Sequence, residues 1–220
     1  MPFFKKFFIL LAVSLFSLPF SAAPIFALHQ FSDVPDSHIY HEVLDFLKER
    51  EVIAGYTDGT FKPDSPIKRV EAIKILFEGA NLIVSEVSSK EDADFPDVTP
   101  GQWYVKYIVE AKNRGIVAGF KDGTFRPVNT IKLAEALKIL FLTYNVSVPN
   151  LPTNADLPSD VKSTDWFAKY VHYALQKGII QEINSLVGPG TELSRSRFAN
   201  LVFRLSFLRE RVVQKFTEVD

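Results

Sequence analysis

The chain repeats itself at a spacing of about 64 residues, and this repetition limits the fold more than any other feature of the sequence. The ten residues from 54 read AGYTDGTFKP and the ten from 118 read AGFKDGTFRP, which is seven identities at an offset of 64. The same offset relates the FSDV at Phe31 to the FPDV at Phe95, and an offset of 63 leads on to the PSDV at Pro158. A fixed period of this length indicates a repeat architecture built from one supersecondary unit. We therefore predict three structural repeats.

The third copy is the most divergent. Its KGII at Lys177 matches the RGIV at Arg114, but Asn184 and Ser185 replace the Asp-Gly turn of the other copies, and one residue is deleted.

Each copy begins with an Asp-containing turn followed by apolar residues at helical spacing, which predicts an amphipathic helix. We expect the apolar face of this helix to lie in the core. Its members are Ile39, Val43, Leu44 and Leu47 in the first copy, Trp103, Tyr107, Ile108 and Ala111 in the second, and Trp166, Tyr170, Val171 and Ala174 in the third.

Glycines separate the elements of each copy. Gly115 and Gly178 occupy the place where a helix ends on a left-handed residue, a place that Glu51 takes in the first copy. In the loop that follows, we expect Gly59 and Gly123 to adopt positive φ. The neighbouring phenylalanines of this loop should enter the core, and they are Phe61 and Phe125.

A second helix is predicted after each loop, from Ile67 to about Ala80, from Ile131 to about Tyr144 and from Leu193 to about Phe216. Helices that alternate with short loops indicate an all-α fold of three tandem helix-loop-helix repeats. Three units of similar size can close around a pseudo-threefold axis and so bury the apolar stripe of each unit.

The linkers support this partition. Residues 85–94 are polar and charged, and residues 146–159 contain three prolines, so both should be surface connections. The predicted units are residues 29–84, 93–148 and 156–210, followed by a helical tail over residues 211–220.

The N-terminal segment has the order of a secretory signal peptide. Lys5 and Lys6 precede an apolar run from Phe7 to Leu18, and Pro19 and small residues follow. The run is shorter than the roughly 20 residues that cross a bilayer. We predict a signal peptide over residues 1–27 with cleavage after Ala27, and contact with the membrane only where this segment stays attached. The mature protein is then exported.

Composition excludes several classes of function. The chain has 25 Lys and Arg against 26 Asp and Glu, so it lacks the basic excess that binding to nucleic acid requires. It has no cysteine, which excludes disulfides, thiolate metal sites and thiol nucleophiles.

At these motifs the chain resembles the S-layer homology repeats, three-copy modules that fix exported proteins to bacterial envelopes. The resemblance covers about residues 29–210 and rests on the Asp-Val opening, the Gly-Ile-(Ile/Val)-x-Gly segment and the Tyr/Phe-x-Asp-Gly-Thr-Phe-x-Pro loop. It implies non-covalent binding of a secondary cell-wall polysaccharide, often with pyruvylated ends, in grooves between the units. It implies no catalytic activity and no cofactor, and it places the protein in the cell envelope, cell wall or S-layer.

The family begins its second helix with Thr-Arg-Ala-Glu, in which Thr and Glu form a capping box. We expect the Arg to point outward as a receptor for a carboxylate. This chain departs from the motif in every copy. It has KRVE from Lys68, KLAE from Lys132 and SRSR from Ser194, so no copy keeps the full box and the Arg remains only as Arg69 and Arg195. Caps at Ser65, and at Asn129 or Thr130, are the expected replacement.

By this resemblance the candidate ligand-binding residues are Arg69, Glu71, Lys68, Lys132, Glu135, Ser194, Arg195, Asp33, Asp97, Asp160, Trp103 and Trp166. Each also has a structural interpretation. The arginines can be solvated residues of a first helical turn, and the lysines can simply face solvent. We expect the three aspartates to serve turns or helix starts and the two tryptophans to lie in the core, with sugar contact as the alternative for both groups.

His38 and His41 have a spacing that can serve a metal ion, but no further paired ligands complete a set, so no metal site is predicted. The sequence thus predicts a non-catalytic module that binds an anionic glycan of the envelope, with other envelope proteins as further partners. The alternative is a protein–protein adaptor whose sugar-binding motifs have degenerated.

Overall fold

The computed structural model describes residues 31–85 and 93–217, with side chains up to residue 206, and within them the fold is all-α as predicted. The predicted signal peptide, residues 1–27, lies outside the described residues. The helices are α1 (His41–Glu49), α2 (Arg69–Gly79), α3 (Val105–Asn113), α4 (Leu133–Thr143), α5 (Ala168–Gln176) and α6 (Arg195–Thr217). No helix in the described ranges is long and apolar enough to cross a membrane.

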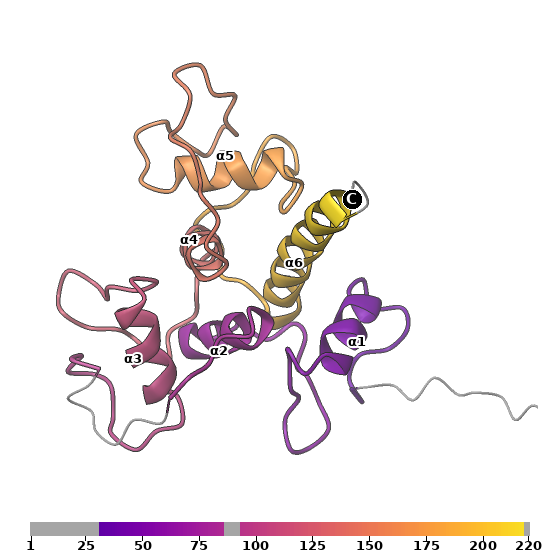
Figure 1. The fold of residues 1–220 in the computed structure, drawn as a ribbon, viewed down its shortest axis with the longest axis vertical. Helices are drawn as coiled ribbons and strands as arrows, with labels where there is room; N and C mark the ends of the chain where they lie inside the picture. The colour runs from indigo at the N-terminus through magenta and orange to yellow at the C-terminus, as the bar shows by residue number, and fades with distance from the viewer. Residues whose placement is uncertain (1–30, 86–92, 218–220) are drawn as a thin grey trace, which may run out of the picture.

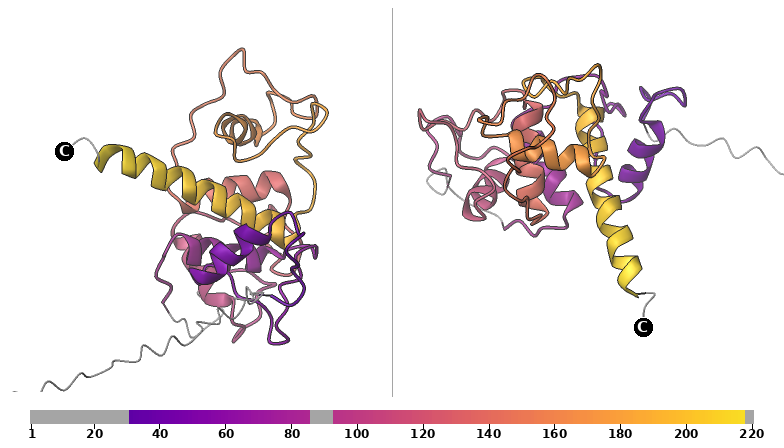
Figure 2. Two further views of the ribbon diagram at one scale, coloured as in Figure 1. Left: turned by 90° about the vertical axis from the view of Figure 1, so that its right-hand side faces the viewer. Right: turned by 90° about the horizontal axis from the view of Figure 1, so that it is seen from above.

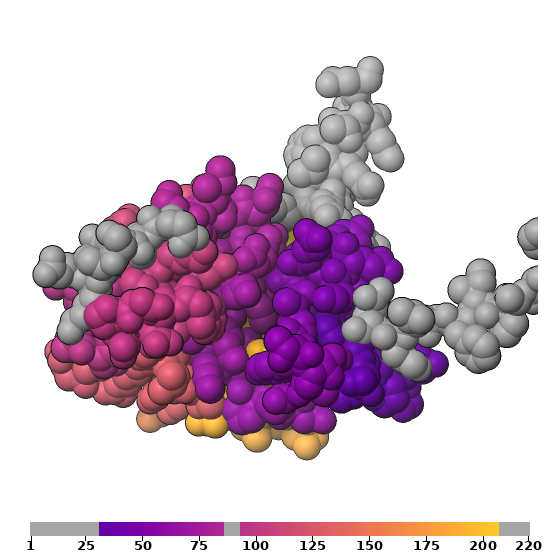
Figure 3. Space-filling view, turned by 90° about the horizontal axis from the view of Figure 1, so that it is seen from below, coloured from indigo at the N-terminus to yellow at the C-terminus, as the bar shows by residue number. Residues whose placement is uncertain are grey.

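The six helices form three pairs, each of which joins two different repeats. The inner helices α2, α4 and α6 meet at the centre, and each outer helix packs on the inner helix of the repeat before it: α3 on α2, α5 on α4, and α1 on α6 (Figure 1). The last pair joins the two ends of the described chain through an edge-to-face contact between Phe46 and Phe203. The space-filling view shows the first two repeats side by side (Figure 3). The three repeats therefore close into a ring.

A triangle of backbone hydrogen bonds lies at the centre of this ring. The N–H of Ile67 donates to the carbonyl of Leu193 at 2.9 Å, that of Ile131 to Ile67 at 3.1 Å, and that of Leu193 to Ile131 at 3.1 Å. All three side chains are fully buried. Because each repeat both donates to one neighbour and accepts from the other, the predicted pseudo-threefold arrangement is confirmed.

This triangle explains why the inner helices begin two residues later than predicted. Ser65, Asn129 and Thr130 do not cap α2 and α4, because they lie in the segments that pair across the ring before the helices begin; the carbonyls of Ser65 and Asn129 accept the N–H groups of Arg195 and Arg69 there. The N-cap residues are Lys68 and Lys132. A lysine side chain accepts no hydrogen bond, so only half of a capping box exists here.

The loops are built largely as predicted. Gly59 and Gly123 have φ of 80° and 81°, and Phe61 and Phe125 are fully buried. Glu51 takes the same left-handed conformation, with φ of 58°, as the glycines that end α3 and α5. These two helix-ending glycines are Gly115 and Gly178.

The Asp-Gly turns are held by their own side chains. Asp122 accepts hydrogen bonds from the hydroxyl and the N–H of Thr124 and from the guanidinium of Arg126. These bonds favour the carboxylate and hold the pKa of Asp122 well below its usual range.

Helix α6 is more than twice as long as the other described helices, with 23 residues, and its C-terminal part projects from the ring (Figure 2). It includes residues 211–217 of the predicted tail.

Candidate functional site

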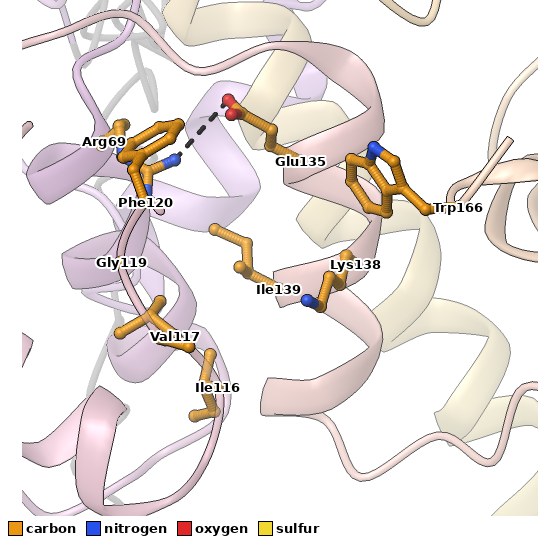
Figure 4. Close-up of a pocket in the computed structure, with 10 residues that line it drawn as sticks. Arg69, Ile116, Val117, Gly119, Phe120, Glu135, Lys138, Ile139 and Trp166 are labelled. Atoms are coloured by element: carbon orange, nitrogen blue, oxygen red, sulfur yellow. Dashed lines mark ion pairs between the residues drawn. The ribbon is translucent and has the colours of Figure 1, made fainter. Parts of the chain in front are cut away.

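A groove between repeats, here called groove A, draws residues from all three copies (Figure 4). Its cavity has a volume of about 190 Å³. The wall comes from the loop after α3 and from α4, with Arg69 of the first repeat at one side and Trp166 of the third at the other. The lining residues are Arg69, Ile116, Val117, Ala118, Gly119, Phe120, Glu135, Lys138, Ile139 and Trp166.

A second groove, groove B, repeats this arrangement one unit earlier in the chain. Its lining residues are Val52, Ala54, Gly55, Tyr56, Glu71, Lys74, Ile75, Trp103 and Arg195. Each is the sequence equivalent of a residue of groove A. The ring closure supplies the two residues that come from neighbouring repeats, Arg195 and Trp103.

Arg69 is buried between two repeats. Its Nε donates to the carbonyl of Phe125 at 3.1 Å, and its Nη1 lies 3.6 Å from Oε2 of Glu135. The guanidinium carbon lies 4.8 Å from the ring centroid of Phe120. Burial lowers the pKa of Arg69 and the carboxylate of Glu135 opposes this, so the guanidinium stays charged. The expectation that this Arg points outward was wrong, because the closed ring places the loop of the next repeat over it.

Arg195 makes the equivalent contacts in groove B. Its Nε donates to the carbonyl of Phe61 at 2.8 Å, and its Nη1 lies 3.5 Å from Oε2 of Glu71. Tyr56 covers the guanidinium at 4.9 Å and donates its hydroxyl to Glu71 at 3.3 Å. Burial and Glu71 raise the pKa of Tyr56, whereas Arg195 lowers it, and the net direction is upward.

Glu71 and Glu135 each stabilise the start of a helix and also line a groove. Oε2 of Glu71 accepts the N–H of Lys68 at 2.9 Å, and Oε2 of Glu135 accepts that of Lys132 at 3.1 Å. In the third copy the cap comes instead from the hydroxyl of Ser194, which accepts the N–H of Arg197 at 3.2 Å. Each glutamate is thereby fixed at the helix start where it meets the buried guanidinium.

Comparison with known proteins assigns the chain to a family. The family model described as the S-layer homology domain matches residues 30–73, 94–137 and 159–196. The chain belongs to the S-layer homology family. Together with its relatives, this membership indicates a protein exported to the cell envelope or S-layer.

The relatives of this S-layer homology chain include "Cellulosome-anchoring protein" of Acetivibrio thermocellus, which is 28% identical over 74% of the chain and 35% of the relative. "Cell surface glycoprotein 1" of the same species is 30% identical over 69% of the chain and 7% of the relative. "S-layer protein" of Bacillus thuringiensis subsp. finitimus is 25% identical over 68% of the chain and 18% of the relative. The chain thus spans about a third or less of the length of these proteins.

The two tryptophans of the S-layer homology module are not core residues, contrary to expectation. Trp103 is 49% exposed and Trp166 is 55% exposed, and Ile39 at the equivalent place in the first repeat is 85% exposed. Helices α3 and α5 begin only at Val105 and Ala168, so the tryptophans precede the helices and the helical phase does not apply to them. They form the rims of grooves B and A.

Two lysines of the grooves were missed by the sequence analysis. Nζ of Lys74 lies 5.6 Å from the ring centroid of Trp103, and Nζ of Lys138 lies 5.7 Å from that of Trp166. Each lysine follows the glutamate of its helix start by three residues, and residues at this spacing lie on the same helix face. This spacing could have identified the lysines as groove residues. Lys68 and Lys132 are exposed and line neither groove.

Three aspartates at equivalent positions of the repeats, Asp33, Asp97 and Asp160, hold loops and line neither groove A nor groove B. Asp97 accepts the N–H groups of Phe125 and Arg126 at 2.8 and 2.7 Å, and Asp33 does the same for Phe61 and Lys62. Asp160 accepts the N–H groups of Val187 and Gly188. A structural role was expected, but each aspartate holds a loop about 28 residues away rather than its own turn or helix.

Replacing Asp97 with Asn should destabilise the fold and leave the grooves in place. The amide keeps one acceptor oxygen but turns an N–H₂ toward a backbone N–H, which should lower the free energy of unfolding by about 1–3 kcal/mol. Urea unfolding followed by circular dichroism measures this. A variant as stable as the wild type would contradict the bracing role, and Asp94→Asn, an exposed aspartate, is the matched control.

His38 and His41 lie near carboxylates of α1, of the turn before it and of the loop before α2. Nε2 of His41 lies 3.2 Å from Asp36 and 3.3 Å from Asp45, and His38 lies 4.0 Å from Asp64. Within the described part of the chain, no group of three or more His, Asp or Glu is arranged to hold a metal ion.

Proposed function

We propose that this S-layer homology module attaches to the cell surface by holding an anionic secondary cell-wall polysaccharide in grooves A and B. The observation that carries the proposal is the duplicated pairing of an exposed tryptophan with a lysine and a buried arginine. Two separate grooves with one chemistry suit a polymer that presents the same unit many times.

The side chains match the parts of such a unit. An exposed indole stacks on the apolar face of a sugar ring, and Lys74 or Lys138 beside it attracts a carboxylate, such as the one on a pyruvylated sugar. The buried guanidinium and its glutamate offer donors and acceptors to sugar hydroxyls at the groove floor. Since the Arg–Glu pair is held by the fold itself, little ordering is needed on binding.

Two grooves on one rigid ring also raise the affinity for a polymer. Once one groove holds a chain, the second binds at a high effective concentration, so weak single sites give firm attachment. The relatives' printed names, which include an anchoring protein and S-layer proteins, support this role. One relative is "Amylopullulanase", of which the chain covers 9%, and we propose a non-catalytic part for the shared module.

The adaptor alternative predicts a protein partner instead. One observation favours it: in the second copy Leu133 replaces the groove arginine, and the Leu133 side chain is fully buried. Under this alternative the polysaccharide would not be needed for attachment.

Co-sedimentation with protein-stripped envelope sacculi separates the two functions. We expect wild type to pellet, Trp103→Ala and Trp166→Ala each to weaken binding about three- to tenfold, and the double variant to lose about the product of these factors. Because both tryptophans lie on the surface, these variants should fold normally. Val128→Ala, at a 60% exposed residue outside both grooves, is the control.

High salt should weaken wild-type binding, since charged groups contribute to it. A wild-type protein that pellets only when envelope proteins are left on the sacculi would overturn the polysaccharide proposal in favour of the adaptor.

A further inference from the structure

A third groove, groove C, lies at the position that the pseudo-threefold axis relates to grooves A and B. It is formed by the loop after α5, by α6 and by Tyr40 before α1, and its volume is about 190 Å³. Its lining residues are Tyr40, Ile179, Ile180, Gln181, Ile183, Arg197, Asn200, Leu201 and Arg204.

The charged residues of groove C are reversed relative to the other two grooves. Leu133 stands where Arg69 and Arg195 stand, and Arg197 stands where Glu71 and Glu135 stand. Asn200 replaces the lysine and Ile39 replaces the tryptophan. In groove C the positive charge of Arg197 therefore lies where grooves A and B carry their glutamate. The position that carries the buried arginine in grooves A and B is the uncharged Leu133.

The two arginines of groove C lie on one side of α6. They are seven residues apart, which is two helical turns, so their side chains can approach one ligand from the same helix face. Nη1 of Arg204 donates to the carbonyl of Gly178 at 2.7 Å, which fixes that side chain at the groove. The guanidinium of Arg197 makes no hydrogen bond or ion pair with the residues that the structure describes.

Among the residues whose side chains the structure describes, no carboxylate lines groove C. Glu182 belongs to the same loop but is exposed and outside the lining. Grooves A and B each carry an arginine, a lysine and a glutamate, so groove C has one positive charge more than either of them. Groove C has no tryptophan in its described lining, where Tyr40 is the aromatic residue, and it differs from grooves A and B mainly in its charge.

We propose that groove C binds a phosphate group through Arg197 and Arg204. Two guanidiniums that face no carboxylate of the described lining match a dianion better than a single carboxylate, and the planar fork of arginine fits phosphate oxygens with paired hydrogen bonds. The phosphate can belong to a phosphodiester-linked envelope polymer or be free in solution. This inference does not rest on polysaccharide binding in grooves A and B.

Titration of the full-length chain with inorganic phosphate tests the proposal. Phosphate should shift the Nε–Hε resonances of Arg197 and Arg204 in ¹⁵N spectra of the arginine side chains and leave those of Arg69 and Arg195 in place. Arg197→Gln should weaken phosphate binding about tenfold, since it removes a charge-assisted hydrogen bond. Lys121→Gln, which removes an exposed lysine from the second-repeat loop, is the matched control and should bind as wild type does.

Equal shifts at all four arginines, no shift at Arg197, or full binding by Arg197→Gln would each overturn the proposal. A parallel titration with oligomeric glycerol phosphate identifies the source: tighter binding per phosphate than inorganic phosphate supports a polymer, and equal binding supports free phosphate. The Trp103→Ala, Trp166→Ala double variant should still bind phosphate. Its behaviour on sacculi therefore reports on grooves A and B alone, and failure of one proposal is distinguishable from failure of the other.

Discussion

Replacing Phe125 with Ala is expected to lower the free energy of unfolding by about 3–5 kcal/mol. The side chain is fully buried and its ring packs 5.3 Å from that of Phe95, so truncation leaves a cavity where the loop enters the core. The cavity would also lie against the guanidinium of Arg69, whose carbon is 5.0 Å from the ring centroid. Urea unfolding at neutral pH, followed by circular dichroism, measures the loss.

Phe120→Ala is the matched control for this variant. The same substitution five residues earlier removes a partly exposed ring from the lining of groove A, so the loss should be less than half as large. Equal losses for the two variants would contradict the view that the Phe of the Asp-Gly-Thr-Phe motif is the residue that anchors the loop in the core in the first two repeats.

Replacing Arg195 with Met is expected to cost about 3–5 kcal/mol. The Arg195 side chain is only 7% exposed, and its guanidinium joins two repeats through the carbonyl of Phe61 and the carboxylate of Glu71. The methionine fills a similar volume, but it leaves the partly buried Glu71 without its counter-charge and the carbonyl of Phe61 without its donor. Both repeats of the junction lose contacts, so unfolding should remain cooperative at a lower urea midpoint.

Arg126→Met tests the same chemical change on the surface. Arg126 pairs with Asp122 at 2.8 Å, but the two side chains are 41% and 50% exposed, so the loss should stay below about 1 kcal/mol. If the Arg195 variant were as mild, the buried pair would contribute nothing to ring closure. The double variant Arg195→Met, Glu71→Gln should recover part of the stability, because the isolated charge is removed.

The burial of both arginines changes how binding experiments must be designed. From the sequence, Arg69 was expected to point outward from the first helical turn as a receptor for a carboxylate. In the structure the Nε of Arg69 donates a hydrogen bond to the carbonyl of Phe125. A variant at this position therefore perturbs the fold and the groove together. The exposed Trp103 and Trp166 allow the binding test that the arginines do not.

Local features of the chain were predictable because they follow from local chemistry. The Asp-Gly turn requires a residue with positive φ, and Gly59 and Gly123 supply it. The apolar spacing within each inner helix has a single physical explanation, an amphipathic or buried helix, which α2 and α4 confirm. The errors at the helix starts arose where chain geometry is set by another repeat rather than by neighbours in sequence.

By itself the sequence determined the number of repeats, the helical class, the turns and the family, since each depends on residue types at fixed short spacings or on a period of about 64 residues. Only the tertiary structure decided that Trp103 and Trp166 line grooves, that Arg69 and Arg195 are buried, and that Lys74 and Lys138 face the tryptophans. Each of these facts depends on which repeat packs against which. The ring brings residues such as Arg195 and Phe61 together across 134 positions of the chain, and no local pattern records that contact.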